Sequence, residues 1–396
     1  MKQLSILGST GSIGRQCLSV VESLPGRFGV VALAAGANLE ELIGQIERHQ
    51  PEVVSVADSN RADELSRLLR EKGIARKPEI HYGREGMLAV GTHAKADIVV
   101  SAAVGVVGLE ATYEAVKLGK TVALSNKEVL VAAGELVMAA AKQSGRELLP
   151  VDSEHNAVHQ CLRGGTHGEV RRLVLTASGG PFRKTPLAAL ANVTREQALA
   201  HPNWRMGNRI TIDSATMMNK GFEIIEARWL FGMRPDQIDV LVHPQSTVHS
   251  MVEFVDGSVL AQLGPADMRM PIQYALTYPE RVASNNVALE WAKLKRLDFQ
   301  KASARRFPCL RLAKEAMKKG GALPCALNAA DEIAVAAFLE ERLPFLGIPE
   351  VIERVLARTP RTRFEKMDDV LSADVEARRI AEEEVGKLAT TAVAVR

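Results

Sequence analysis

Asp152 and Glu154 are the first residues whose types and spacing suggest chemistry, because Asp152-Ser153-Glu154 places two carboxylates two positions apart. The preceding segment 147–149 is typical of a buried strand. In an extended backbone, residues i and i+2 point to the same side, so both carboxylates are expected to converge on one cation. Donor sets made only of oxygen favour Mg²⁺ or Mn²⁺ over zinc. The alternative is that these residues cap a helix beginning near Asn156.

A second pair of carboxylates, Glu223 and Glu226, lies three residues apart in a segment with a helical pattern. This spacing places both on one helix face, among apolar neighbours such as Ile224. A carboxylate is costly to bury without a partner, so one of the two is expected to be a third metal ligand. The other is expected to pair with an arginine such as Arg228 or with a partner that the sequence does not reveal, and such pairing is the alternative for both.

Gly8, Gly11 and Gly14 form a G-x-x-G-x-x-G pattern between a predicted strand at 4–7 and a predicted helix. Glycines at such a turn let the backbone approach a pyrophosphate at the helix N-terminus, so the pattern favours dinucleotide binding. The alternative is a tight turn that needs glycine for steric reasons only. Segment 34–38, at the end of the second strand, has no acidic residue to hold a ribose 2′-hydroxyl, which favours NADP over NAD.

Polar residues also follow later strands. Lys127, between Asn126 and Glu128, is a candidate to contact both cofactor and substrate, because strand-end loops line the ligand crevice of an open parallel sheet. The alternative is a surface lysine beside a glutamate that starts a helix. The turn 178–181 offers backbone amides to an anion, or is a simple turn before a proline. Segment 213–220 carries hydroxyl, amide and ammonium groups that suit a phosphate.

Trp204 lies in segment 201–208, whose composition predicts a loop. An indole exposed on a loop is unfavourable unless it covers something, so we expect this loop to act as a lid. The alternative is that Trp204 anchors the loop to the core.

The order of elements predicts an α/β protein with several domains. Residues 1–150 alternate apolar runs with helical patterns, which is typical of a Rossmann-like dinucleotide-binding domain. Its strands are expected near 4–7, 30–34, 53–56, 98–102, 122–124 and 148–151. Residues 151–285 are typical of an α+β catalytic domain, 286–312 of a connector, and 313–396 of a helical C-terminal domain.

Composition excludes several classes of protein. The 396 residues include 50 basic and 47 acidic side chains, a net charge of +3 without long runs of one sign, so nucleic acid is not an expected partner. No stretch approaches the roughly 18 apolar residues of a membrane span. Four widely spaced cysteines form no C-x-x-C pair, so a reducing cytoplasm is the expected location.

Several ordered blocks together resemble the 1-deoxy-D-xylulose 5-phosphate reductoisomerase family of the non-mevalonate isoprenoid pathway. The blocks are 8–14 (GSTGSIG), 125–128 (SNKE), 151–156 (VDSEHN), 178–182 (SGGPF), 201–204 (HPNW) and 213–221 (DSATMMNKG), with further similarity at 243–246 and 327–330. The resemblance therefore spans essentially the whole chain.

The resemblance implies roles for particular residues. It implies a divalent metal, Mg²⁺ or Mn²⁺, held by Asp152, Glu154 and Glu223, with Glu226 left to structure. The substrate residues it implies are Ser178, Ser214, Asn219 and Lys220 for the phosphate, with His201 beside it, and Ser153, Glu154 and Lys127 for the sugar hydroxyls. The implied NADPH site consists of Thr10, Gly11, Ser12, Ile13, Gly36, Asn38, Asn126, Glu128 and Gly207. Trp204 and Met206 belong to the implied lid, and the family is homodimeric.

The implied activity is the NADPH- and metal-dependent rearrangement and reduction of 1-deoxy-D-xylulose 5-phosphate to 2-C-methyl-D-erythritol 4-phosphate. Ala37 stands where some relatives have a basic residue near the ribose, which bears on the strength of the NADPH preference. One alternative is a metal-assisted NADP dehydrogenase of a phosphorylated sugar without skeletal rearrangement. Another is a non-catalytic NADP-binding sensor.

Overall fold

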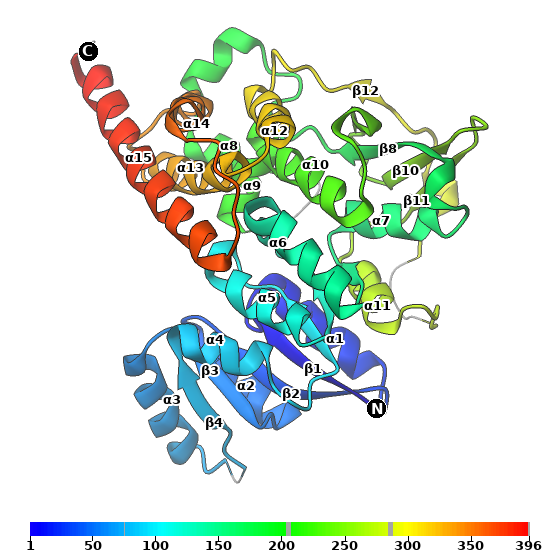
Figure 1. Cartoon of the computed structure of the whole chain (residues 1–396), viewed down its shortest axis with the longest axis vertical. Coiled ribbons are helices and arrows are strands. Elements are labelled where there is room, and N and C mark those ends of the chain that lie inside the picture. The colour runs from blue at the N-terminus through cyan, green and yellow to red at the C-terminus, as the bar shows by residue number, and fades with distance from the viewer. Residues whose placement is uncertain (75, 203–206, 284–287, 395–396) are drawn as a thin grey trace. The chain divides into compact units, whose positions relative to one another are not determined.

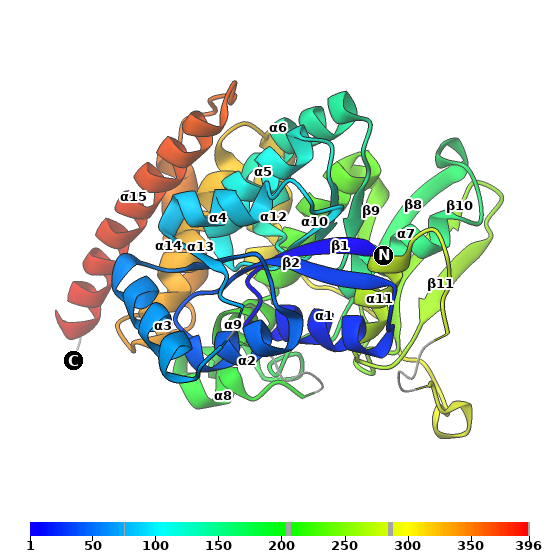
Figure 2. The same cartoon turned by 90° about the horizontal axis from the view of Figure 1, so that it is seen from below.

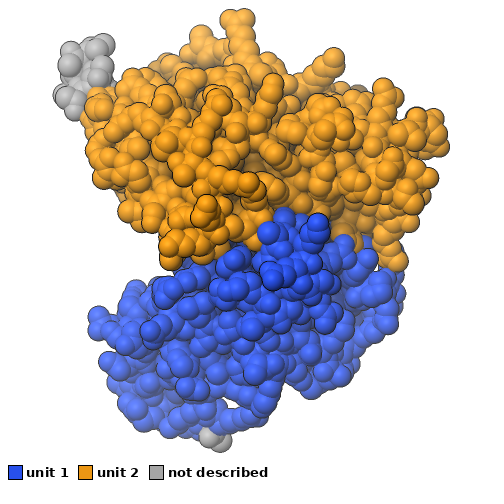
Figure 3. Space-filling view, viewed as in Figure 1, with its two compact units in different colours: residues 1–129, 137–156, 267–287 blue, residues 130–136, 157–266, 288–396 orange. Residues whose placement is uncertain are grey.

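The computed structural model describes residues 1–74, 76–202, 207–283 and 288–394, with side chains up to Ala389. The chain forms two compact units, each built from several stretches of sequence (Figure 3). The first unit contains 1–129, 137–156 and 267–287, and the second contains 130–136, 157–266 and 288–396.

The first unit is built on a parallel sheet of seven strands (Figure 1). Its strands are β1 (Lys2–Leu7), β2 (Phe28–Ala34), β3 (Val53–Val56), β4 (Glu79–Tyr82), β5 (Ile98–Ser101), β6 (Thr121–Leu124) and β7 (Leu148–Pro150), in the order β4-β3-β2-β1-β5-β6-β7. The order of the strands across the sheet changes direction at β1. The carboxyl ends of β1 and β5 therefore flank the switch point at which such sheets bind ligands.

Helices cover both faces of this sheet. They are α1 (Ser12–Ser23), α2 (Leu39–His49), α3 (Ser59–Glu71), α4 (Gly83–Gly91), α5 (Leu109–Lys117) and α11 (Arg269–Thr277). Figure 2 shows α1 and α2 below β1 and β2, with α4 and α5 above them. Apart from the edge strand β4, the strands are largely buried on both faces and are therefore mostly apolar, as in Val53–Val56, where Ser55 is the one polar residue.

The second unit combines a smaller sheet with a group of helices. The sheet contains β8 (Val170–Ala177), β9 (Ile238–Val242), β10 (Val248–Phe254), β11 (Val259–Leu263) and β12 (Gln300–Lys301), in the order β11-β10-β8-β9-β12. Only β8 and β9 run parallel. The helices are α8 (Arg195–Leu199), α9 (Asn208–Thr216), α10 (Met218–Phe231), α12 (Pro308–Lys319), α13 (Leu323–Leu339), α14 (Gly347–Arg358) and α15 (Met367–Ala394). One apolar core joins these helices to the sheet.

Two helices contain residues of both units. They are α6 (Glu128–Ser144), which has a non-helical residue at Ala133, and α7 (Ser153–Leu162). Each helix begins directly after a strand of the first unit, and each first turn carries residues predicted to take part in the site.

The predicted α/β class is confirmed, and each of the six predicted strands of residues 1–150 is present. β4 was not predicted, because this edge strand has no buried side chain and thus no apolar run. The compact units follow contacts and not sequence order, so 267–287 joins the first unit although the predicted boundary is at 285. In the part of the chain that the structure describes, no helix is both long and apolar enough to cross a membrane.

The expected extended conformation of Asp152-Ser153-Glu154 is wrong. α7 begins at Ser153, and the Asn156 amide donates to the Asp152 carbonyl at 2.8 Å, so these residues form the start of a helix. The alternative, a helix beginning near Asn156, agrees better with the structure, in which the helix begins three residues earlier, at Ser153. Asp152 and Glu154 therefore project from the first turn of a helix and not from one side of a strand.

Candidate active site

The glycine turn between β1 and α1 has the open backbone that a pyrophosphate needs. Gly11 is the N-cap of α1, and no side chain caps the first turn. Gly11 and Ser12 are exposed, whereas Thr10 and Ile13 are half-buried. The free amides and the positive end of the helix dipole thus face outward, which fits an anionic cofactor group.

Gly14 allows this turn to pack tightly. A Cβ at Gly14 would lie 2.4 Å from the carbonyl oxygens of Gly8 and Ser9. A Cβ at Gly8, where φ is +86°, would lie 2.5 Å from the Ala102 carbonyl oxygen. Glycine is therefore required here by sterics, and the close packing also brings the 102–108 loop beside the turn.

We predict that Gly14→Ala will weaken NADPH binding by at least about tenfold, because the methyl group displaces the turn backbone that we expect to contact the pyrophosphate. Gly44→Ala on α2 is the matched control, since a Cβ there meets nothing within 4 Å. NADPH fluorescence titration measures both variants. Equal affinity of the Gly14 variant and wild type would contradict this role for the turn.

The other predicted cofactor residues of the first unit have clear structural roles. The Asn38 side chain accepts a hydrogen bond from the Glu41 amide at 3.1 Å and caps α2, while Gly36 and Ala37 are exposed beside it. Asn126 donates to the carbonyls of Ala103 at 2.5 Å and Gly105 at 2.7 Å, which fastens the loop after β5.

That loop presents two residues that the predicted site left out. Val104 and Val107 are 71% and 70% exposed at the carboxyl edge of the sheet. Exposed valines beside a glycine turn suit the flat face of a cofactor ring. The sequence signal that could have identified these valines is the position of Ala102–Gly105 directly after a predicted strand.

Lys127 and Asp152 form a buried ion pair at the ends of β6 and β7. The Lys127 Nζ lies 2.5 Å from Asp152 Oδ2, and His155 Nδ1 is 3.8 Å from the same oxygen. Glu128 follows Lys127 in the first turn of α6. The alternative of Lys127 as a surface lysine is wrong, because its side chain is only 9% exposed. A buried ammonium next to a carboxylate is placed to contact polar ligand oxygens.

Ser153 and Glu154 complete this part of the first unit. Ser153 Oγ donates to Glu154 Oε2 at 2.5 Å. The start of α7 is fixed by Asn156, whose side-chain amide donates to the carbonyls of Pro150 at 2.9 Å and Pro271 at 3.2 Å. The carboxylates are thereby presented by a rigid helix start, at the positive end of its dipole.

Glu223 lies in the second unit, on the inward face of α10, and is fully buried. Asn219 Nδ2 donates to Glu223 Oε1 at 2.6 Å, and Lys220 Nζ donates to Glu223 Oε2. Glu226 is also fully buried. Arg228 was expected to pair with one of these glutamates. In the structure, Arg228 instead donates to the Met317 carbonyl and lies over the Trp229 ring.

The residues predicted to hold the phosphate are close together in the second unit. Ser178 Oγ is 3.1 Å from His201 Nε2. A Cβ on Gly180, where φ is +64°, would lie 2.7 Å from the Ser214 carbonyl oxygen, so the 178–181 turn packs directly on α9. Met217 then adopts a left-handed conformation that ends α9 and starts α10, which carries Asn219 and Lys220.

The chemistry of this group suits a phosphate. Lys220 is buried and supplies an ammonium, while Ser178, Ser214 and Asn219 supply neutral donors. Burial lowers the pKa of His201, which favours the neutral imidazole, so this side chain offers a hydrogen bond and not a positive charge.

Three residues of the predicted site and lid are placed differently from the rest. Gly207 caps α9 in the second unit, whereas the glycine turn lies in the first. Trp204 and Met206 lie outside the described residues, so the predicted lid stays a prediction.

Comparisons with known proteins identify the family. A family model described as 1-deoxy-D-xylulose 5-phosphate reductoisomerase matches residues 4–134, and the model of its C-terminal domain matches 148–231. A third, described as DXP reductoisomerase C-terminal domain, matches 263–380. The reductoisomerase of Solibacter usitatus is 51% identical over 97% of this chain and 97% of its own length. That of Geobacter metallireducens is 50% identical over 98% and 100%.

Solved structures agree with the sequence matches. The reductoisomerase of Zymomonas mobilis in complex with NADPH has a TM-score of 0.90 and 43% identity, covering 97% of this chain and 99% of that one. A DOX-P reductoisomerase in complex with NADPH, fosmidomycin and magnesium has a TM-score of 0.92 and 38% identity, covering 98% of both chains. The chain described here belongs to the 1-deoxy-D-xylulose 5-phosphate reductoisomerase family.

Proposed function

We propose that Asp152, Glu154 and Glu223 hold the divalent metal of this enzyme, and that Ser178, His201, Ser214, Asn219 and Lys220 hold the substrate phosphate. The reaction follows from family membership: 1-deoxy-D-xylulose 5-phosphate is rearranged and reduced to 2-C-methyl-D-erythritol 4-phosphate, with NADPH and a divalent metal. The assignment of these residues is the proposal.

The contacts of Glu223 carry this proposal. Its buried carboxylate is bound by Asn219 and Lys220, so a proposed metal ligand and two proposed phosphate ligands share one turn of α10. A sugar phosphate offers a phosphate group at one end and hydroxyl and carbonyl oxygens along its chain. One helix turn therefore matches both kinds of group.

The donor chemistry fits both cofactors. Three carboxylates form an oxygen-only set for a hard cation, which Mg²⁺ satisfies. A bound divalent ion supplies Lewis acidity at the oxygens of the reacting carbons. NADPH supplies the hydride, and the uncapped first turn of α1 with the exposed Gly11 fits its pyrophosphate.

The protein's own side chains are proposed to position the substrate. Lys127, held by Asp152 at 2.5 Å, is placed to donate to a substrate hydroxyl and to stabilise negative charge there. Ser153 and Glu154 are proposed to orient the neighbouring hydroxyls. Lys220 and Ser214 bind the phosphate away from the reacting carbons, which fixes the substrate and converts binding energy into orientation.

The test of the function is NADPH oxidation measured with 1-deoxy-D-xylulose 5-phosphate, with and without a chelator. We expect oxidation that stops on chelation and returns with added Mg²⁺. Isotopic tracking of the substrate carbons distinguishes the skeletal rearrangement from simple reduction. A reduced product with an unrearranged chain would favour the metal-assisted dehydrogenase, and no turnover would favour the sensor.

We also propose a homodimer that forms through β11. This strand is the edge of its sheet, and its residues Val259 and Leu260 are 51% and 40% exposed. An exposed apolar edge strand favours pairing with another chain. We predict that Val259→Lys shifts the protein toward monomer in analytical ultracentrifugation, whereas Val375→Lys on α15, where valine is 67% exposed, leaves the mass unchanged. A monomeric wild type would contradict the proposal.

A further inference from the structure

The second unit contains a cavity that the proposed reaction does not use. Its volume is about 360 Å³, which is within the usual range for sites that bind small molecules. The lining includes 131–136 of α6, Arg228 and Trp229 of α10, Met317 of α12, and Phe364, all from the second unit. None of the residues that line it is assigned above to the metal, the phosphate or NADPH.

One wall of the cavity is formed where α6 departs from a regular helix. Ala133 has non-helical dihedral angles, with φ −132° and ψ 23°. A Cβ on the next residue, Gly134, would lie 2.3 Å from Trp229 Cδ1, so the indole packs directly on the α6 backbone. A side chain that inserts against a helix is a known cause of such a kink. The packing of α6 on α10 therefore fixes this wall.

The walls of the cavity are mostly apolar. Val131 and Met317 are buried, whereas the aromatic side chains of Trp229 and Phe364 are half-buried. Aromatic rings that remain partly exposed in a concave site favour a ligand that covers them with a flat apolar group.

Arg228 gives the cavity a positive charge. Its Nη1 donates to the Met317 carbonyl in the last turn of α12, and its guanidinium lies 5.3 Å from the centre of the Trp229 ring. In the part of the chain that the structure describes, no carboxylate pairs with Arg228. A guanidinium carries several further N–H donors, and these can bind an anion in the cavity.

Glu135 is the acidic residue among those that line the cavity, and its partner is Arg363. Glu135 Oε1 accepts from Arg363 Nε at 2.9 Å, and the Glu135 side chain is 46% exposed. Arg363 therefore offsets the charge of Glu135, whereas no described acid offsets that of Arg228. This balance of charge favours an anionic ligand.

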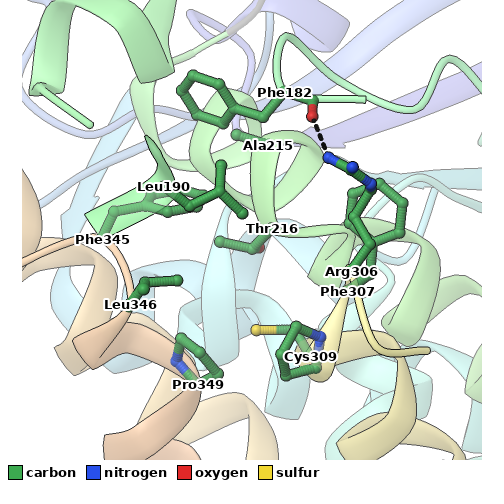
Figure 4. Close-up of a pocket in the computed structure, with 11 residues that line it drawn as sticks. Phe182, Leu190, Ala215, Thr216, Arg306, Phe307, Cys309, Phe345, Leu346 and Pro349 are labelled. Atoms are coloured by element: carbon green, nitrogen blue, oxygen red, sulfur yellow. Dashed lines mark hydrogen bonds between the residues drawn. The ribbon is translucent and has the colours of Figure 1, made fainter. Parts of the chain in front are cut away.

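A different arginine shows what a purely structural role requires. Arg306 lines a cavity of about 20 Å³, which holds about one water molecule. Its Nη1 donates to the carbonyls of Phe182 at 3.0 Å and Thr185 at 2.6 Å (Figure 4). Arg306 thus fastens backbone beside a space that is too small for a ligand. Arg228 also binds a backbone carbonyl, but the cavity beside it is large enough for a small molecule.

We propose that the cavity beside Arg228 binds a small aromatic carboxylate. Its ring packs on Trp229 and Phe364, and its carboxylate accepts hydrogen bonds from Arg228. The planar guanidinium suits a carboxylate, because both groups are flat and can form paired hydrogen bonds. The site is separate from the proposed metal and phosphate ligands, so its test does not depend on their assignment.

The first test uses naphthalene-2-carboxylate and the uncharged naphthalene-2-carboxamide, which has nearly the same shape. Isothermal titration calorimetry of the wild type with the carboxylate is expected to show a single site with a Kd of about 1 mM or lower. The carboxamide should bind at least about tenfold more weakly, because it lacks the charge. No binding of the carboxylate, or equal affinity for both probes, would overturn the proposal.

The second test is Arg228→Gln, which removes the charge but keeps a donor for the Met317 carbonyl. We expect its affinity for the carboxylate to fall at least about tenfold, while its affinity for the carboxamide stays within about twofold. Arg195→Gln is the matched control, because Arg195 donates to the Leu339 carbonyl at the end of α13 at 3.2 Å and does not line the cavity. Unchanged carboxylate binding by Arg228→Gln, or an equal loss in Arg195→Gln, would contradict the role of Arg228.

Two further measurements locate the bound probe. Lys220→Gln should bind the carboxylate as the wild type does, and loss of binding there would move the probe to the proposed phosphate site and reject this cavity. If Arg228→Gln does not fold, crystals of the wild type are soaked with 6-bromonaphthalene-2-carboxylate. The anomalous signal of bromine should lie beside Trp229, and a signal found elsewhere alone would overturn the proposal.

Discussion

Asp152→Asn is expected to lower kcat by at least about a thousandfold while leaving the NADPH dissociation constant within about twofold of wild type. The amide keeps the size of the side chain but removes one of the three proposed metal-ligating charges and the carboxylate that lies 2.5 Å from Lys127. Loss of Lewis-acid stabilisation worth about 4 kcal/mol corresponds to this factor. The glycine turn that we expect to bind NADPH is unaltered, so cofactor affinity should be preserved.

The control for this variant is Asp267→Asn in the same unit. Asp267 pairs with Arg269 at 2.6 Å, and that contact lowers the pKa of the Asp267 carboxyl. It has no proposed role in the reaction, so kcat should stay within about twofold. Turnover by Asp152→Asn at more than a tenth of the wild-type rate would remove Asp152 from the metal site.

Lys220→Gln is expected to raise the KM for the sugar phosphate by about 10- to 100-fold. Lys220 is proposed as the only ammonium among the phosphate ligands, and a hydrogen bond to a charged group contributes about 1.5–3 kcal/mol. The same change removes the ion pair between Lys220 and the buried Glu223. We therefore expect the variant to melt at a lower temperature in chelator and to be stabilised by Mg²⁺ more than wild type is.

Lys387→Gln is the matched control for this second prediction. Lys387 pairs with Glu384 at the same i, i+3 spacing, but its side chain is 59% exposed. An exposed pair contributes little, so neither KM nor the response to Mg²⁺ should change. An unchanged sugar-phosphate KM in Lys220→Gln would contradict the proposed phosphate site.

Local patterns predicted much of this protein. Strands such as β3 were predictable because burial on both faces favours a run of mostly apolar residues. The glycine turn was predictable because a Cβ at Gly8 or Gly14 would clash with neighbouring backbone atoms, so the turn requires glycine at these positions. Lys127 and Asp152 were singled out as strand-end residues, and in the structure they form a buried pair.

Other features depend on tertiary context that a local pattern does not contain. The spacing of Asp152 and Glu154 fits a strand face as well as a helix start, and only the packing of Asn156 against Pro150 and Pro271 selects the helix. Arg209 and Glu332 are far apart in sequence, and their ion pair at 3.1 Å forms only because α9 packs on α13. This contact was therefore not visible in a local sequence pattern.

The most direct measurement for the proposed metal site is the stoichiometry of Mn²⁺ binding, followed by electron paramagnetic resonance in the presence of NADPH. Wild type should bind one ion per chain, and Asp152→Asn, Glu154→Gln and Glu223→Gln should each lose it. Glu226→Gln, one turn further along α10, should retain it. Retention by Glu223→Gln together with loss by Glu226→Gln would contradict the assignment of the third ligand, and retention by all three ligand variants would contradict the site itself.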